Sequence, residues 1–343
     1  MKDRISETCI GVLGAGRMGL VHCSLIEETP GLRLLAASSR ATVQLEKARE
    51  RFGIKTYDRH EKLLADPEIQ WVVISTTTEN HKEWALKALE AGKEIIVEKP
   101  IALNLGETEE ILKEAEKRKL RVTVHLNRRW DLDFKLIRKV IGEGSIGEVY
   151  RIESGKTDYS AGWAGWGAQG MENPWRIKKR YGGGFLNDWG THLIDQLLLL
   201  KREKVKTVFG RMEGRVWTKE VDDHFWAEIL FSDGTTARVE ASNNFRIPMP
   251  RWFLIGVNGT LKIKGGDPTE WDRATIKKEW DEIDEEVTLS IPHGEISRGF
   301  YSAFAEALRK DKPLPVTPGE ILEVMRVVDA IRKSAESGNS VSL

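Results

Sequence analysis

The stretch that decides the fold is Ile10-Gly11-Val12-Leu13-Gly14-Ala15-Gly16-Arg17-Met18-Gly19, an apolar run that leads into glycines spaced as GxGxxG. The run predicts a β-strand, and the residues after it have helical periodicity. Gly14 permits a tight turn, Gly16 lets a pyrophosphate approach the backbone, and Gly19 lets the helix pack on the strand. The N–H groups at the helix N-terminus then bind the pyrophosphate. This context favours a dinucleotide site over a glycine-rich turn without a ligand.

Residues 8–126 alternate between short β-type runs and segments of helical periodicity. We predict strands at residues 9–13, 32–38, 71–75, 94–97 and 121–126, and helices at 18–28, 42–52, 81–91 and 105–117. Strand–helix alternation produces right-handed βαβ units. The fold class is therefore α/β, with a Rossmann domain of doubly wound parallel sheet over residues 1–127.

After about residue 147 the pattern changes to longer β-type runs with hairpin turns. Asp233-Gly234 separates residues 225–231 from 235–243, and Asn258-Gly259 separates 252–257 from 260–263. We predict a C-terminal α/β domain over residues 128–343 with a large, mainly antiparallel open sheet. Helical patterns at 297–309 and 319–334 close the chain, and we expect these helices to pack back towards the Rossmann domain.

The composition excludes several classes of protein. Lys+Arg and Asp+Glu both number 53 among 343 residues, which removes the electrostatic reason for a nucleic-acid or membrane partner. Two cysteines, Cys9 and Cys23, make no disulfide framework, and no signal peptide is evident, so we expect a cytoplasmic protein. The seven histidines lack metal-ligand spacing, so no metal site is expected.

The end of the second predicted strand indicates the choice of cofactor. An NAD site has an acid there that binds the ribose hydroxyls, whereas this chain has Ser38-Ser39-Arg40. Hydroxyls and a guanidinium suit a 2′-phosphate, so we favour NADP(H), with NAD(H) as the alternative. Ser39 is also a suitable helix N-cap, which is the structural explanation for its presence.

Ligands of doubly wound sheets bind beyond the carboxyl ends of the strands. We therefore expect the cofactor to contact Gly14, Ala15, Gly16, Arg17, Met18, Ser38, Ser39, Arg40, Thr76, Thr77, Thr78, Asn80, His81, Glu98, Lys99, Pro100 and Asn127. A lysine directly after a buried strand is unusual, and Lys99 could polarise a substrate hydroxyl beside a nicotinamide. The alternative is an ordinary residue on the rim of a loop.

A second cluster contains Asp188 and His192, which are four residues apart and share one face of a helix. A histidine held by an acid is a suitable proton acceptor near neutral pH. The alternative is a buried helix whose histidine has a purely structural partner. Asp195 lies three residues further along.

Residues 155–180 form a long segment that is rich in glycine, tryptophan and basic side chains. Aromatic rings can stack on the C–H faces of a sugar, while arginine can bind hydroxyls or a carboxylate. We expect substrate contacts from Arg129, Tyr159, Trp163, Trp166, Trp175, Arg176, Asp188 and His192. A dimer-contact arm is the alternative.

Together these residues resemble the glucose–fructose oxidoreductase/inositol dehydrogenase family, also called Gfo/Idh/MocA. The similar features are the glycine motif, the turn from Thr76 to His81, Glu98-Lys99-Pro100, and Gly183-Gly184 followed by Asp188, His192 and Asp195. The resemblance implies that Lys99, Asp188 and His192 are catalytic. By it His192 exchanges the hydroxyl proton, Lys99 polarises the same oxygen, and Asp188 orients the group. Two departures are Ser39 in place of an acid and Thr77 in place of a proline.

Three functions are compatible with these patterns. We favour an NADP(H)-dependent dehydrogenase or ketoreductase that acts on a sugar, glycoside or cyclitol. A glycosidase that uses NAD for transient oxidation is the second hypothesis, and a non-catalytic cofactor-binding sensor is the third. The resemblance also implies a homodimer or homotetramer that assembles through the C-terminal sheet.

Overall fold

The computed structural model describes residues 7–159, 175–266, 268–278, 285–289 and 297–343. The chain divides into two compact units, of which the first comprises residues 1–126 and 297–322 and the second comprises 127–296 and 323–343. Residues 297–322 therefore belong to the first unit, although they follow most of the second unit in the sequence. Throughout the described residues, every helix is too short or too polar to cross a membrane.

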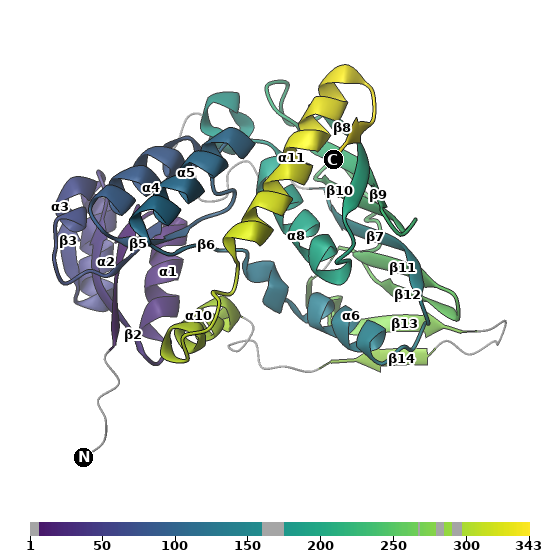
Figure 1. Cartoon of the computed structure of the whole chain (residues 1–343), viewed down its shortest axis with the longest axis horizontal. Helices are drawn as coiled ribbons and strands as arrows, with labels where there is room; N and C mark the ends of the chain where they lie inside the picture. Colours follow the sequence, from purple (N-terminus) through teal and green to yellow (C-terminus); the bar gives the residue numbers. More distant parts are fainter. Residues whose placement is uncertain (1–6, 160–174, 267, 279–284, 290–296) are drawn as a thin grey trace, which may run out of the picture. The chain divides into compact units, whose positions relative to one another are not determined.

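The first unit is built on a six-stranded parallel sheet with the order β3-β2-β1-β4-β5-β6 (Figure 1). Its elements are β1 (Thr8–Leu13), α1 (Arg17–Glu27), β2 (Leu32–Ser38), α2 (Thr42–Phe52), β3 (Lys55–Tyr57), α3 (His60–Leu64), β4 (Trp71–Ile74), α4 (His81–Glu90), β5 (Glu94–Val97), α5 (Leu105–Arg118), β6 (Val122–Val124) and α10 (Gly299–Arg309). The predicted doubly wound Rossmann sheet is confirmed. The apolar runs of β4, β5 and β6 are almost wholly buried, as expected of strands that are covered on both faces.

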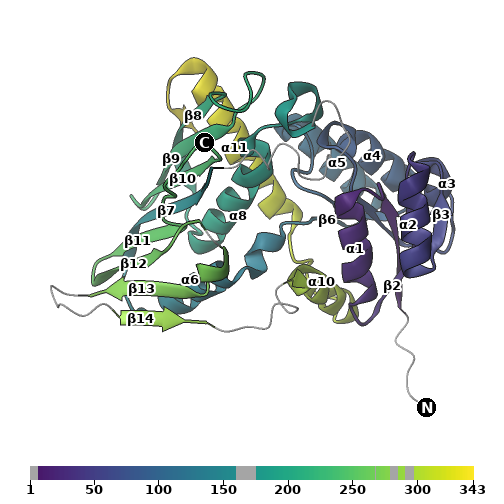
Figure 2. The same cartoon turned by 180° about the vertical axis from the view of Figure 1, so that it is seen from behind.

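The second unit is built on a nine-stranded sheet with the order β14-β13-β12-β11-β7-β10-β9-β8-β15 (Figure 2). Its elements are α6 (Leu132–Gly142), β7 (Val149–Thr157), α8 (Thr191–Leu200), β8 (Val205–Glu213), β9 (His224–Phe231), β10 (Thr236–Ser242), β11 (Trp252–Gly256), β12 (Gly259–Ile263), β13 (Arg273–Lys277), β14 (Glu285–Thr288), most of α11 (Pro318–Ser337) and β15 (Val341–Ser342). The pair β7·β10 is parallel and the other pairs are antiparallel. Both predicted hairpins are present, so the mainly antiparallel sheet is confirmed.

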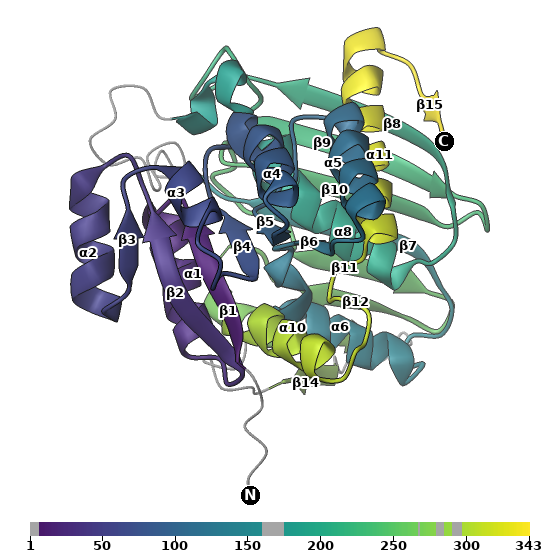
Figure 3. The ribbon, with the colours of Figure 1, turned by 60° about the vertical axis from the view of Figure 1, so that its left-hand side comes forward.

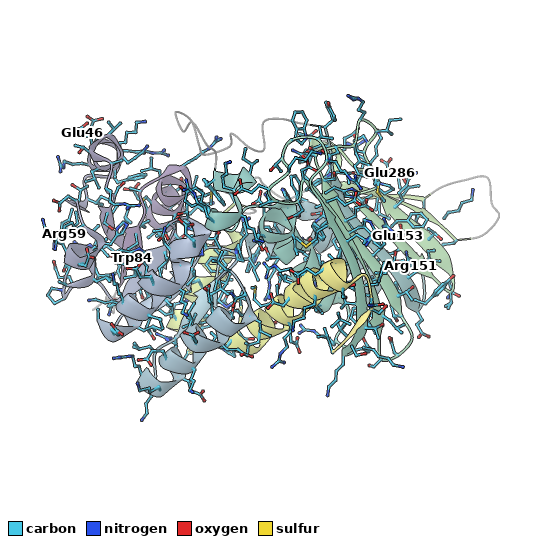
Figure 4. All side chains as sticks on the ribbon, turned by 90° about the horizontal axis from the view of Figure 1, so that it is seen from above. Glu46, Arg59, Trp84, Arg151, Glu153 and Glu286 are labelled. Atoms are coloured by element: carbon cyan, nitrogen blue, oxygen red, sulfur yellow. The ribbon has the colours of Figure 1, made fainter. Side chains whose placement is uncertain are left out.

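The core of the second unit lies between one face of this sheet and the helices α6, α8 and α11 (Figure 3). Burial alternates along β9, as expected of a sheet with one packed face. The opposite face presents charged side chains, among them Arg151 and Glu153, which are labelled in Figure 4 and form an ion pair at 2.9 Å.

Candidate active site

The glycine turn joins β1 to α1 with little spare room. A Cβ at Gly19 would lie 1.9 Å from the carbonyl oxygen of Gly14, so only glycine allows this approach. Gly14 itself has a φ of +93°, and its N–H donates to the carbonyl oxygen of Ser38 at 2.9 Å. At Gly16, by contrast, no described heavy atom lies within 4 Å of an added Cβ. Gly16 is the N-cap of α1 and has no side chain to cap the helix.

The turn lies where the order of the sheet reverses, since β2 flanks β1 on one side and β4 flanks it on the other. The predicted residues that follow β4 form a connected group. Asn80 Nδ2 donates to Thr77 Oγ1 at 3.0 Å. His81 is buried, with Nδ1 2.8 Å from the carbonyl oxygen of Pro100 and Nε2 3.1 Å from that of Thr76. The His81 side chain therefore connects the loop after β4 to the loop after β5.

The end of β2 presents one exposed cation. The Ser38 hydroxyl is buried, 2.7 Å from Nδ1 of His60, so it points into the protein. Ser39 Oγ accepts the N–H of Ala41 at 3.1 Å, but the N-cap of α2 is Ala41, so Ser39 does not cap this helix. Arg40 is exposed, and its charge adds to burial in lowering the pKa of His60. The sequence patterns did not predict His60 as part of this site, because β3 and α3 are too short to show a period.

Lys99 follows the end of β5, and the peptide bond that joins it to Pro100 is cis. Its neighbour Glu98 is buried and bonds to His22 and His125. Neither histidine was predicted as a site residue, because their spacing in the sequence shows no motif.

In the second unit, the helix that carries Asp188 and His192 differs from a plain α-helix. Leu186–Gly190 forms a π-helical turn, and α8 begins only at Thr191. Asp188 Oδ2 lies 3.5 Å from Nε of Arg176, so the structure brings two of the predicted residues together. His192 is buried, and its ring lies 6.0 Å from that of Trp189.

Trp189 and Asp222 were not predicted as site residues. The guanidinium of Arg128 lies 4.9 Å from the Trp189 ring and the Lys156 ammonium lies 5.4 Å from it. Asp222 accepts the N–H of Leu186 on Oδ2 at 2.8 Å and thereby holds the start of the π-helical turn. Burial raises the pKa of Asp222 to about 6, against the opposing effect of that N–H.

The other predicted substrate residues lie in different surroundings. Arg129 is buried, and its Nε donates to Asp195 Oδ2 at 2.9 Å. Tyr159 is exposed, and its hydroxyl lies 3.1 Å from Nη2 of Arg246. Trp175 lies beneath the Arg176 guanidinium at 4.2 Å, and Trp163 and Trp166 lie outside the described residues. Asn127, which was predicted as a cofactor contact, starts a short 3-10 helix.

Comparisons with known proteins agree with this architecture. Residues 9–126 match the family model for an oxidoreductase family with an NAD-binding Rossmann fold, and residues 134–262 match the GFO/IDH/MocA C-terminal domain. The scyllo-inositol 2-dehydrogenase (NADP(+)) of Bacillus subtilis is 26% identical over 100% of this chain and 98% of its own length. An oxidoreductase of Schizosaccharomyces pombe is 29% identical over 97% and 98% of the two chains.

Among solved structures, an NAD-binding protein from Listeria innocua is 30% identical, with a TM-score of 0.85 over 98% of this chain and 97% of that chain. The likeness spans both units, so neither the Rossmann sheet nor the nine-stranded sheet is an isolated match. This chain belongs to the GFO/IDH/MocA family and is an oxidoreductase with an NAD-binding Rossmann fold.

Proposed function

We propose that this protein is an NADP(H)-dependent oxidoreductase that interconverts a secondary alcohol and a ketone on a sugar, glycoside or cyclitol. The open N-terminus of α1 at Gly16 carries the proposal, because it leaves room for a pyrophosphate at the positive end of the helix dipole. The nicotinamide, when bound, supplies or accepts the hydride. The name of the related scyllo-inositol 2-dehydrogenase (NADP(+)) supports both the cofactor and the substrate class.

Arg40 and Ser39 support the choice of NADP(H). Arg40 is an exposed guanidinium that can pair with two phosphate oxygens, and the Ser39 hydroxyl keeps its own proton to donate. Arg40→Ala should raise the KM for NADP(H) about 10- to 100-fold and leave that for NAD(H) unchanged. Arg33→Ala is the matched control, because Arg33 is exposed at the opposite end of β2. Higher activity of the wild type with NAD(H) than with NADP(H) would contradict this assignment.

Lys99, Asp188 and His192 are the proposed catalytic residues. His192 exchanges the proton of the substrate hydroxyl, and Lys99 polarises the same oxygen. Asp188 binds and orients the group, while Arg176 at 3.5 Å helps to fix its carboxylate. Lys99→Ala should lower kcat about 100- to 10,000-fold with little change in cofactor affinity. Lys113→Ala, on the exposed side of α5, is the control, and normal turnover of Lys99→Ala would refute the assignment.

A single screen tests the reaction class. Absorbance at the nicotinamide band is followed with NADP(H) and NAD(H) against a panel of sugars, glycosides and cyclitols. Substrate-dependent change in the band supports an oxidoreductase of this class. Release of free sugar without net change in the cofactor would indicate a glycosidase instead. A wholly inactive panel would indicate a cofactor-binding sensor.

We also propose that the protein forms a homodimer or homotetramer through the charged face of the nine-stranded sheet. Trp226 lies on this face of β9, with the Arg238 guanidinium 4.7 Å from its ring. Arg151 pairs there with Glu228 at 2.8 Å. Tryptophan and arginine are enriched at subunit interfaces relative to the rest of a protein surface. Sedimentation should show Trp226→Glu as a smaller species than the wild type, and equal masses would contradict the assignment.

A further inference from the structure

Three titratable side chains meet inside the first unit. Nε2 of His22 lies 2.8 Å from Oε1 of Glu98, and Nδ1 of His125 lies 2.9 Å from the same oxygen. All three residues are buried. A buried carboxylate destabilises a fold unless it is fully hydrogen-bonded, so a group at this position needs a specific role.

The network extends to α10, which lies beside α1 in Figures 1 and 2. The Tyr301 hydroxyl is 2.7 Å from Nδ1 of His22. When neutral His22 carries its proton on Nε2, it donates to Glu98 and accepts the Tyr301 proton on Nδ1. The His125 ring packs edge-on against Phe300 at 4.8 Å, which restricts its rotation. In this tautomer the hydrogen bonds run from the Tyr301 hydroxyl through His22 to the Glu98 carboxylate.

The carboxylate is held as an anion. Burial alone would raise the pKa of the Glu98 carboxyl, but His125 and His22 outweigh burial and hold the pKa well below its ordinary value. Burial and the nearby Glu98 charge raise the pKa of Tyr301, so this phenol stays protonated and continues to donate.

The second carboxylate oxygen contacts the proposed catalytic lysine. Oε2 of Glu98 accepts the backbone N–H of Lys99 at 3.1 Å. Glu98 also donates its own N–H to the carbonyl oxygen of Ile74, at the end of β4. The Glu98 carboxylate thus links His22 on α1, the helix that starts at the glycine turn, to the backbone of Lys99 after β5.

We propose that Glu98 is a positioning residue whose carboxylate, held by His22 and His125, fixes the backbone at Lys99 and so aims the Lys99 ammonium at the substrate oxygen. The proposal rests on the catalytic role of Lys99 given above. Misplacement of a reacting group by about 1 Å lowers turnover by about 100-fold. Cofactor binding depends on the glycine turn, so the dissociation constant for the cofactor should not change when turnover falls.

The test is a double-mutant cycle with Glu98→Gln and Lys99→Ala in the full chain. Glutamine keeps the shape of the side chain but loses the charge that accepts two imidazole N–H groups. Glu98→Gln should lower kcat about 100-fold, with less than about 3-fold change in KM and in the dissociation constant for NADPH. In the Lys99→Ala background, Glu98→Gln should change kcat by less than about 3-fold, because its effect acts through Lys99.

Thr123→Val is the control, because it removes one buried hydrogen bond of the same unit, from Thr123 Oγ1 to the carbonyl oxygen of Val316 at 2.9 Å. Its kcat should equal that of the wild type. If Glu98→Gln does not fold, His125→Asn replaces it in the cycle, with an expected loss of about 10-fold.

The outcomes separate the two proposals. Normal turnover of Lys99→Ala overturns the catalytic assignment itself. If Lys99→Ala lowers kcat, and Glu98→Gln lowers it by the same further factor in the Lys99→Ala background as in the wild type, only the positioning role is overturned. Stoichiometric zinc in the purified protein that disappears in Glu98→Gln would also overturn it, because the three ligand atoms lie within 4.8 Å of one another and a metal would replace the imidazole protons.

Discussion

Asp222→Asn tests how the helix that carries Asp188 and His192 is held. Asp222 is buried and accepts the N–H of Leu186 at the start of this helix. Asparagine keeps an oxygen that can accept the same N–H, but it has no charge to bury. The variant therefore isolates the ionisation of one carboxyl group.

The expected magnitude follows from the pKa of Asp222, which burial raises from 3.8 to about 6. The folded state holds the proton more tightly than the unfolded state, so stability is greatest below the unfolded pKa and is lost as the pH rises through about 6. By linkage, the total loss is about 3 kcal/mol, of which about 1.4 kcal/mol falls between about pH 5 and about pH 8. Asp222→Asn has no carboxyl group to ionise at this position, so its unfolding free energy does not show this loss.

Urea unfolding followed by tryptophan fluorescence measures the difference. The unfolding free energy of Asp222→Asn, relative to the wild type, should rise by about 1.4 kcal/mol over this pH interval. Asp223→Asn is the control. Burial tends to raise the pKa of Asp223, but the N–H groups that donate to its carboxylate lower this pKa. The stability that the Asp223 carboxylate contributes is therefore lost only at acid pH. A constant difference for Asp222→Asn across the interval would refute the reasoning.

Three further outcomes are expected. Gly19→Ala places a Cβ 1.9 Å from the Gly14 carbonyl oxygen, so the dissociation constant for NADPH in a fluorescence titration should rise at least about 10-fold, and an unchanged constant would contradict the turn geometry. Arg251→Met removes the buried partner of Asp133, 2.8 Å away, and should lower the unfolding free energy by about 3–5 kcal/mol, whereas a loss under about 1 kcal/mol would show that the pair is dispensable. Burial raises the pKa of Cys23 to about 12, so mass spectrometry should find this thiol labelled about 1,000-fold more slowly than an exposed thiol until the protein is unfolded.

Local patterns predicted much of the Rossmann unit. Residues 32–38, 42–52 and 94–97 form β2, α2 and β5 with the bounds expected from their periodicity. The glycine turn could also be predicted, because it depends on residues close together in the sequence. A Cβ at Gly19 would clash with the carbonyl oxygen of Gly14, and Gly14 itself has a positive φ. The three-residue β3 and five-residue α3 escaped prediction, since a segment of that length shows no period.

The sequence by itself determined the two kinds of sheet, the glycine turn and the presence of Lys99 beyond a buried strand, because each depends on neighbours along the chain. Only the tertiary structure decided the partners of the buried polar groups. Glu98 meets His22 from 76 residues away and His125 from 27 residues away, and Arg129 meets Asp195 from 66 residues away. These contacts depend on which strands are adjacent in the sheet and on which helices cover it, and no local period in the sequence records that order.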